Sequence, residues 1–249
     1  MKKIELLLLC GLINISLIAQ SSNNQLFQSI SGNLKDPSFF INTNYFHTNS
    51  LLFELHDSTS SNICLSDYST GIDSFLTPVL LTNNNYQNIN PVGIWVGDKK
   101  IVFFQTNSSG NWNIAYREYL NGTWGDAKVI SDPTGNDISL SVIKYKIYYY
   151  YGNLPVGIVY QKNNSIYIFT KNDSVESNRE VIQGSDSLKY SAPSAMYDDV
   201  YYSNEWNYPA IRITAIQTDN LQNERIIEKD ISLSSNIDTT FIVDEGDVN

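Results

Sequence analysis

The feature that most constrains the fold is a strand-rich unit that recurs along the chain. In its clearest copy, residues 90–137, short apolar runs alternate with turn signals such as Asn121-Gly122, a pair typical of tight hairpins. The predicted second strand of the unit begins near Leu51, Ile101, Val156 and Ile211, and the predicted fourth strand passes through Ser29, Val79, Val129, Val181 and Ile231. Both strands repeat with a step of about 50 to 55 residues, so the chain contains several copies of one unit.

The other two strands of the unit follow the same step. Predicted third strands centre on Ile63, Ile114 and Ile166, with a weaker copy at residues 224–227. Predicted first strands open at Asp36-Pro37, Asn90-Pro91, Ile138-Ser139, Ala192-Pro193 and Asp238-Thr239. A unit of about 50 residues with four antiparallel strands has the size and content of a β-propeller blade.

We therefore predict an all-β fold, a β-propeller with about four blades and a partial one over residues 21–249. Runs such as residues 101–104 are almost continuously apolar, as strands are when neighbouring blades cover both faces. A closed ring would join lone strands at residues 25–30 and 239–243 in a blade without its two middle strands. Because such a blade leaves unpaired edges, we expect an incomplete ring that is part of a longer protein. An immunoglobulin-type sandwich is the alternative, although it does not require so regular a step.

Residues 1–20 have the pattern of a secretory signal peptide. Two lysines precede an apolar stretch, and Ala19-Gln20 offers a small-residue cleavage point. The stretch is short and interrupted, so we predict a secreted or cell-surface protein with no transmembrane segment in the mature chain. Cys10 stands where a lipid-modified cysteine could stand, but leucines precede it where such sites need small residues. After cleavage Cys64 is the one remaining cysteine, which excludes an internal disulfide and favours a small buried side chain on a strand.

The composition limits the class of partner. Hydrophobic residues make up 42% of the chain and charged residues 17%, while 17 tyrosines help to raise the aromatic share to 12%. These values are typical of a globular, strand-rich protein rather than a disordered one. The net charge of -10 argues against a nucleic-acid partner, whose phosphates require a basic surface.

One copy of the unit resembles the blade motif of TolB-type propellers. Residues 97–104 resemble its turn of Asp-Gly-Lys character with the apolar strand that follows, and residues 110–116 resemble its Gly-Asn-x-Asp-Ile-Tyr segment. Asn113 stands where the motif has Asp, and Val96-Gly97 replace its Ser-Pro. The resemblance covers about one blade well, and it implies a propeller with binding roles and no catalytic residue to transfer.

A second and fainter resemblance is to sialidase-type propellers. Residues 108–112 are similar to the Ser-x-Asp-x-Gly-x-x-Trp turn of those blades, but the Asp is absent and the Gly-to-Trp spacing differs. That resemblance implies an enzyme with several arginines for a substrate carboxylate, a Tyr–Glu nucleophile pair and an acid. The arginines of the chain are Arg117, Arg179, Arg212 and Arg225, and Arg117 and Arg212 fall on different strand types.

Groups of residues with catalytic or metal-binding character are scarce. His47 and His56 lack the spacing of a metal-ligand pair and are interpreted as surface or turn residues. The acidic residues at 198–199 and 244–247 lack the alternating spacing of a calcium loop and are interpreted as solvated turn residues. We therefore predict no catalytic residue, no metal site and no cofactor.

Aromatic residues are the best candidates for ligand binding. They lie in two long excursions between first and second strands, residues 145–154 and 198–208. Exposed rings stack on the apolar faces of sugars or anchor a protein partner. The predicted ligand-binding residues are Tyr149, Tyr151, Tyr201, Tyr202 and Trp206. The alternative is that these rings pack between blades.

Three functions remain open. The leading hypothesis is an exported, non-catalytic propeller that binds a protein or carbohydrate partner at the cell surface or outside the cell. The alternatives are a truncated propeller glycosidase of sialidase type and a structural repeat segment of a large surface protein. Arginines and carboxylates converging on the ring axis would favour the enzyme, whereas exposed Tyr and Trp on one rim would favour binding.

Overall fold

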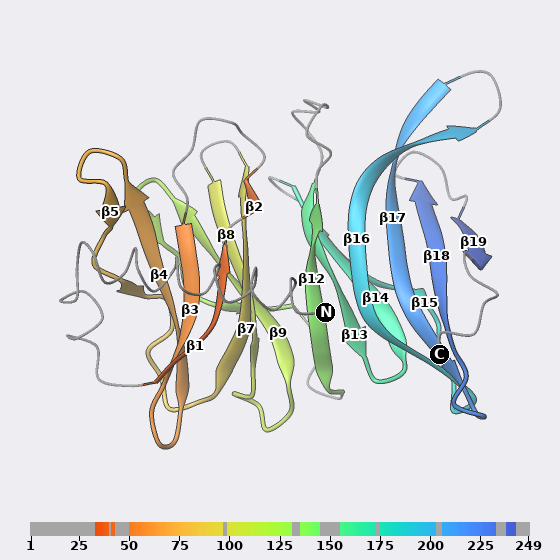
Figure 1. Ribbon diagram of the computed structural model, residues 1–249, viewed down its shortest axis with the longest axis horizontal. Helices are drawn as coiled ribbons and strands as arrows, with labels where there is room; N and C mark the ends of the chain where they lie inside the picture. The colour runs from red at the N-terminus through yellow and green to blue at the C-terminus, as the bar shows by residue number, and fades with distance from the viewer. Residues whose placement is uncertain are drawn as a thin grey trace, which may run out of the picture.

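The computed structural model describes residues 33–39, 41–42, 50–96, 99–130, 135–144, 155–172, 175–202, 206–232 and 238–242. All regular secondary structure in this part of the chain is β-strand, and the strands form four antiparallel blades side by side (Figure 1). None of the described residues forms a helix long and apolar enough to cross a membrane. The prediction of an all-β, incomplete propeller is confirmed.

Each blade is built from consecutive strands, which pair in the order in which they occur. Blade 1 consists of β1 (Asn33–Phe39), β3 (Ser50–His56), β4 (Ser61–Ser69) and β6 (Val79–Leu80). Blade 2 consists of β7 (Asn88–Val96), β8 (Lys99–Thr106), β9 (Asn113–Leu120) and β11 (Lys128–Val129). Blade 3 consists of β12 (Asp137–Lys144), β13 (Val156–Lys162), β14 (Ser165–Lys171) and β15 (Glu176–Ile182). Blade 4 consists of β16 (Leu188–Tyr202), β17 (Trp206–Asp219), β18 (Glu224–Ser232) and β19 (Asp238–Ile242).

Three short strands complete the pairing. β5 (Ser74–Phe75) pairs with β4, and β10 (Thr123–Trp124) pairs with β9. β2 (Ile41–Asn42) follows β1 and pairs in parallel with β7, the first strand of the next blade. In the same way the end of β12 pairs in parallel with β16. The first strands of neighbouring blades therefore lie beside each other, and we call the edge that they form the inner edge.

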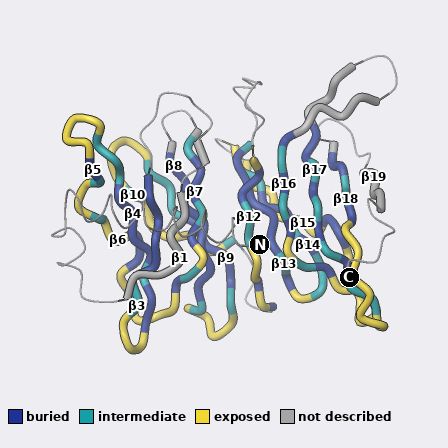
Figure 2. Tube along the Cα trace, viewed as in Figure 1, coloured by how far each residue is buried: buried dark blue, intermediate teal, exposed yellow. Residues whose placement is uncertain are grey.

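Apolar side chains between neighbouring blades form the core. In β8, Phe103 packs toward blade 3 whereas Val102 and Phe104 pack toward blade 1, because side chains alternate along a strand. Both faces of this strand are thus buried, which explains its continuously apolar sequence. Each such side chain contributes about 1.5–3 kcal/mol when fully buried. Figure 2 shows buried residues along the strands and exposed ones mainly in the turns.

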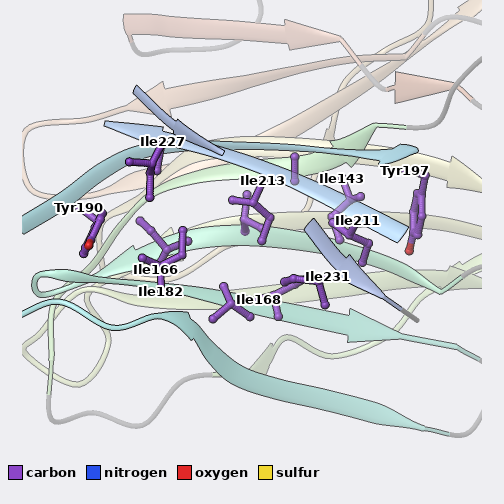
Figure 3. Packing of buried hydrophobic residues seen from close by; sticks show 14 residues of the cluster. Ile143, Ile166, Ile168, Ile182, Tyr190, Tyr197, Ile211, Ile213, Ile227 and Ile231 are labelled. Atoms are coloured by element: carbon purple, nitrogen blue, oxygen red, sulfur yellow. The ribbon is translucent and has the colours of Figure 1, made fainter. Parts of the chain in front are cut away.

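The junction between blades 3 and 4 has the largest of these cores. Figure 3 shows its isoleucines, which come from strands of both blades, with Tyr190 and Tyr197 among them. On blade 1, Cys64 is buried beside Phe53 on the face opposite to blade 2. Burial raises the pKa of the Cys64 thiol to about 11, so the interpretation of Cys64 as a buried strand residue is confirmed.

Blade 4 differs from its sequence prediction. Ile231 was expected in a fourth strand, but it lies in β18, the third strand, together with residues 224–227. β17 is 14 residues long, so all nine residues of β18 pair with it and β18 extends beyond the short third strand that the sequence predicted. The fourth strand is β19, which pairs with β18 where the sequence predicted the first strand of a further blade. Residues 25–30, expected to form a lone strand, lie outside the described part.

Candidate ligand-binding site on the inner edge

Every first strand contains a β-bulge near the end at which it begins, the lower end in Figure 1. One extra residue interrupts the pairing between Lys35 and Ser38, Ile89 and Val92, Ile138 and Ser141, and Ser191 and Ser194. Three bulge residues are exposed and have a positive φ: Asn90 (51°), Ser139 (53°) and Ala192 (47°). A left-handed conformation costs a non-glycine residue about 1–3 kcal/mol and concentrates at functional sites. Because bulges also re-aim side chains, we call the two polar residues among them, Asn90 and Ser139, the bulge site and treat it as the candidate functional site.

The bulges explain the recurring proline that the sequence shows. Pro37, Pro91 and Pro193 were predicted to open the first strands, but they lie inside these strands, at the bulges. A bulge leaves a residue out of the hydrogen-bond ladder, so a proline without an N–H is accommodated there. In β12, Leu140 replaces the proline while Ser139 keeps the positive φ.

The backbone of Asn90 is held by blade 1. Its N–H donates to Glu54 Oε1 at 2.6 Å, and Glu54 Oε2 lies 2.6 Å from Nε2 of His56. Glu54 is 1% exposed, and a buried carboxylate requires such partners. His56 is the last residue of β3 and lies beside a turn, as the sequence predicted. It is half-buried and pairs with Glu54, a contact that the sequence did not predict. His47 lies outside the described residues.

The side chain of Asn90 is held from its own blade. Asn90 Nδ2 donates to Gln105 Oε1, and Gln105 Nε2 donates to the backbone oxygen of Asp137 in blade 3 at 2.8 Å. Gln105 is buried, whereas Asn90 is exposed. The Oδ1 atom of Asn90 has no hydrogen-bond partner among the described residues. Asn90 is therefore fixed by groups from three blades and presents one unused acceptor to solvent.

Ser139 occupies the corresponding place in blade 3. Its side chain is exposed, and its hydroxyl has no partner within the described residues. Ile138 beside it is 37% exposed. Asp137, two residues earlier, is fully buried and is the register partner of Lys162 on β13. The bulge site thus combines an amide oxygen, a hydroxyl group and some apolar surface on a strongly supported backbone.

Backbone hydrogen bonds between turns and connections keep the lower end rigid. In blades 1 to 3, the chain around the turn after the second strand is joined to the chain that begins the next blade. The bonds are Ser61 N to Tyr86 O (3.2 Å), Asp137 N to Trp112 O (2.9 Å) and Tyr190 N to Asn164 O (3.0 Å). Asn88 adds side-chain bonds to Ser61 and Asn84. These bonds account for the abundance of Asn and Ser in the turns as structural residues.

The predicted ligand-binding residues that the structure describes do not lie at this end. Tyr149 and Tyr151 are outside the described residues. Tyr201, Tyr202 and Trp206 belong to the hairpin of β16 and β17, which extends beyond the other strands at the upper end (Figure 1). This region was predicted as an excursion, but its backbone continues the ladder, with Tyr202 opposite Trp206 and Tyr201 opposite Asn207.

Two ion-paired clusters lie at the upper end of the blades. Lys100 Nζ is 2.7 Å from Asp67 Oδ2 and 4.4 Å from the centre of the Trp95 ring. Between blades 2 and 3, Lys171 Nζ lies 2.9 Å from Glu176 Oε1 and 3.6 Å from Glu118 Oε2. Both clusters join neighbouring blades. Asp67 belongs to blade 1 and Lys100 to blade 2, whereas Glu118 belongs to blade 2 and Lys171 to blade 3.

A Tyr–Glu pair is present, but it is not an activated nucleophile. The hydroxyl of Tyr116 donates to Glu176 Oε1 at 2.6 Å. Burial and the acceptor Glu176 raise the pKa of Tyr116 well above its usual range, which opposes formation of a phenolate. Tyr116 is on β9, a third strand, away from the inner edge. The pair is a contact between blades.

Three arginines serve as intramolecular donors. Arg117 donates to the backbone oxygens of Gly125, Leu81 and Trp124. Arg212 pairs with Asp230 and Glu228, and Arg225 donates to Gln217. These arginines lie on β9, β17 and β18, so they do not converge at the inner edge as a carboxylate-binding group would.

Comparison with known proteins places the fold. No known protein family matches the sequence, and no curated protein does. Among solved structures, Hadza microbial sialidase Hz136 has a TM-score of 0.53 and 11% identity, covering 87% of this chain and 46% of its own. Trypanosoma rangeli sialidase, in complex with sialic acid, has a TM-score of 0.51 and 9% identity, covering 84% of this chain and 37% of its own. The chain has the fold of propeller glycosidases and spans less than half the length of these two.

This finding corrects the family resemblance drawn from sequence. The structural neighbours are sialidase propellers, so the TolB-type assignment is wrong. The motif that suggested it is an apolar strand followed by a tight turn at Gly110 (φ 91°), and the burial of β8 on both faces accounts for the apolar strand. The likeness to these two sialidases is one of fold.

Sequence reasoning also missed the bulge site. Glu54, Gln105 and Asp137 are far apart in sequence, and their contacts arise only when blades stack. The available signal was the recurring X-Pro step, which was taken as a strand opening.

Proposed function

We propose that the chain is the glycan-binding part of an exported propeller of the glycosidase type, and that the glycan binds at the bulge site. The observation that carries the proposal is the pair of unused polar groups, Asn90 Oδ1 and Ser139 Oγ, at corresponding places on neighbouring first strands. The shared fold with two sialidases over most of the chain supports the same class of ligand.

The chemistry of the bulge site suits a sugar. Hydroxyl groups both donate and accept hydrogen bonds, so an amide oxygen and a serine hydroxyl can each bind one. Ile138 offers apolar surface beside them, as the C–H face of a sugar requires. The rigid support from Glu54 and Gln105 lowers the entropy lost on binding, because both groups hold Asn90 in place before the ligand arrives.

A catalytic role is not assigned to the described carboxylates of the inner edge. Glu54 and Asp137 are almost completely buried, and they support the site through the Glu54 side chain and the backbone oxygen of Asp137. A complete enzyme would draw its catalytic groups from more than these four blades.

The aromatic hairpin is a second contact region in the proposal. Tyr201, Tyr202 and Trp206, at the upper end, would stack on a longer glycan or hold a protein partner. Tyr149 and Tyr151, which lie outside the described residues, belong to the same proposal. Export through residues 1–20 belongs to the same proposal, since glycans of this kind are encountered outside the cell.

The test is glycan binding by the purified chain on an array and by titration. Asn90→Gly and Ser139→Gly remove the polar groups while tolerating positive φ, and the double variant is expected to bind at least tenfold more weakly. Ala192→Gly is the matched control, because it changes a bulge residue without removing a polar group. Absence of glycan binding by the wild-type chain, or equal binding by the double variant, would overturn the proposal.

A further inference from the structure

We infer that Gln105 fixes Oδ1 of Asn90 as an outward-facing acceptor, so that the group of the glycan that meets this oxygen is a donor, a hydroxyl or an N-acetyl N–H, and not a carboxylate. This inference rests on the proposed function and names the chemistry of the group that the bulge site recognises.

The orientation of the two amides follows from one backbone carbonyl. The oxygen of Asp137 can only accept, so Gln105 must turn its NH₂ group toward it. The oxygen of Gln105 then faces Asn90, and Asn90 must in turn present its own NH₂ group. Oδ1, the one acceptor of the Asn90 amide, is left for the ligand, next to the second N–H of Nδ2.

The reverse orientation of the two amides is disfavoured at the buried contact between Gln105 and the backbone oxygen of Asp137. If Gln105 turned over, its oxygen would face the oxygen of Asp137 in a place where Gln105 is 2% exposed. Two facing acceptors without solvent would both lose their hydrogen bonds. The polarity of Asn90 is therefore set from blade 3, through a residue that does not touch the ligand.

The chemistry at Asn90 Oδ1 acts in the same direction. A ligand carboxylate at this oxygen would place two acceptors face to face with no hydrogen between them. A hydroxyl or an amide N–H donates to it instead.

Deoxyfluoro sugars test the inference, because fluorine replaces a hydroxyl without donating. The probes are methyl glycosides of glucose, galactose, mannose and N-acetylglucosamine with their monofluoro analogues, and the methyl glycoside of N-acetylneuraminic acid. We expect one fluorine position in the best-bound series to weaken binding at least tenfold in the wild-type chain and less than twofold in Asn90→Gly. Fluorine substitutions that never weaken binding, or a requirement for the carboxylate, would overturn the inference.

A positioning role for Gln105 has its own readout. In Gln105→Leu the Asn90 amide can rotate, so the ratio of affinities between the parent sugar and its fluoro analogue is expected to fall severalfold. Gln161→Leu is the control, because Gln161 faces the corresponding bulge in blade 3 and donates within its own turn. An unchanged ratio in a folded Gln105→Leu variant contradicts this role. If the chain binds no glycan at all, the proposed function fails and the inference fails with it, whereas binding at the bulge site without the fluorine effect removes the inference alone.

Discussion

The two ends of the blades solve the problem of holding neighbouring blades together in different ways. At the lower end, buried side chains such as Glu54 and Gln105 bond to backbone groups of the next blade. At the upper end, Lys100 and Lys171 form ion pairs with carboxylates that remain partly exposed. Bonds to a backbone fix position, whereas ion pairs between long side chains are weaker and screened by salt. The lower end is therefore the better support for a recognition site.

The largest difference between the ends is expected on removing one carboxylate from each. Glu54→Ala leaves the Asn90 N–H and His56 without their acceptor in a buried place, so we expect a loss of about 2–4 kcal/mol in the free energy of unfolding. Glu176→Ala at the upper end removes a side chain that is 42% exposed but leaves the hydroxyl of the buried Tyr116 without its acceptor, so a smaller loss of about 1–2 kcal/mol is expected. Urea unfolding of both variants measures the contrast, and equal losses would erase the distinction between the ends.

A smaller effect is expected for Lys100→Met. The substitution keeps most of the apolar stem but removes the ion pair with Asp67 and the contact with the Trp95 ring. Because Asp67 is 33% exposed it regains water, so the expected loss is about 1 kcal/mol. Raising the salt concentration should shrink the difference between wild type and variant, since exposed pairs are screened. A salt-independent loss above about 2 kcal/mol would show that this pair behaves as a buried one.

The upper cluster between blades 2 and 3 also predicts a pH dependence. The hydrogen bond from Tyr116 and the pairing with Lys171 lower the pKa of Glu176 below its ordinary value of 4.5. A lowered pKa contributes stability above the unfolded value, and this contribution is lost as the pH falls through the folded value. The stability gap between wild type and Glu176→Gln should therefore narrow between about pH 5 and pH 3. A gap that stays constant over this range contradicts the assignment.

The same cluster loses stability at high pH. Burial and Glu176 raise the pKa of Tyr116 above its ordinary value of 10.0, and the two carboxylates outweigh burial to raise that of Lys171 above 10.5. Raised values contribute stability below the unfolded pKa that is lost as the pH rises through the folded one. Phe cannot ionise, so Tyr116→Phe lacks this loss. The free energy of unfolding of wild type minus that of Tyr116→Phe should therefore be smaller above about pH 10 than at pH 7. An identical alkaline response of the two proteins would contradict the prediction.

The contrast also explains which parts of the molecule could be read from the sequence. The repeat and the strands around Ile63, Ile114 and Ile166 were predictable, because alternation and turn residues act within a few positions. The length of β18 was not, since it depends on the partners that β17 offers. The contacts of Glu54 and Gln105 were not predictable either, because they depend on how far one blade is rotated against the next. The positive φ of Asn90 lay hidden in an X-Pro step that fits a strand start equally well.

The smallest expected effect on stability concerns the tip of the hairpin at the upper end. Trp206→Ala changes the first residue of β17, opposite Tyr202 at the end of β16, and we expect it to change the free energy of unfolding by no more than about 0.5 kcal/mol. If the aromatic hairpin is the second contact region, the variant should bind long glycans at least fivefold more weakly and monosaccharides as wild type does, because only a long ligand reaches both ends. Leu221→Ala, at an 81% exposed residue of another turn, controls for loss of apolar surface alone. If Trp206→Ala binds long and short glycans as wild type does, the bulge site is the whole recognition surface. The lower end would then bind the ligand, and the upper end would only hold neighbouring blades together.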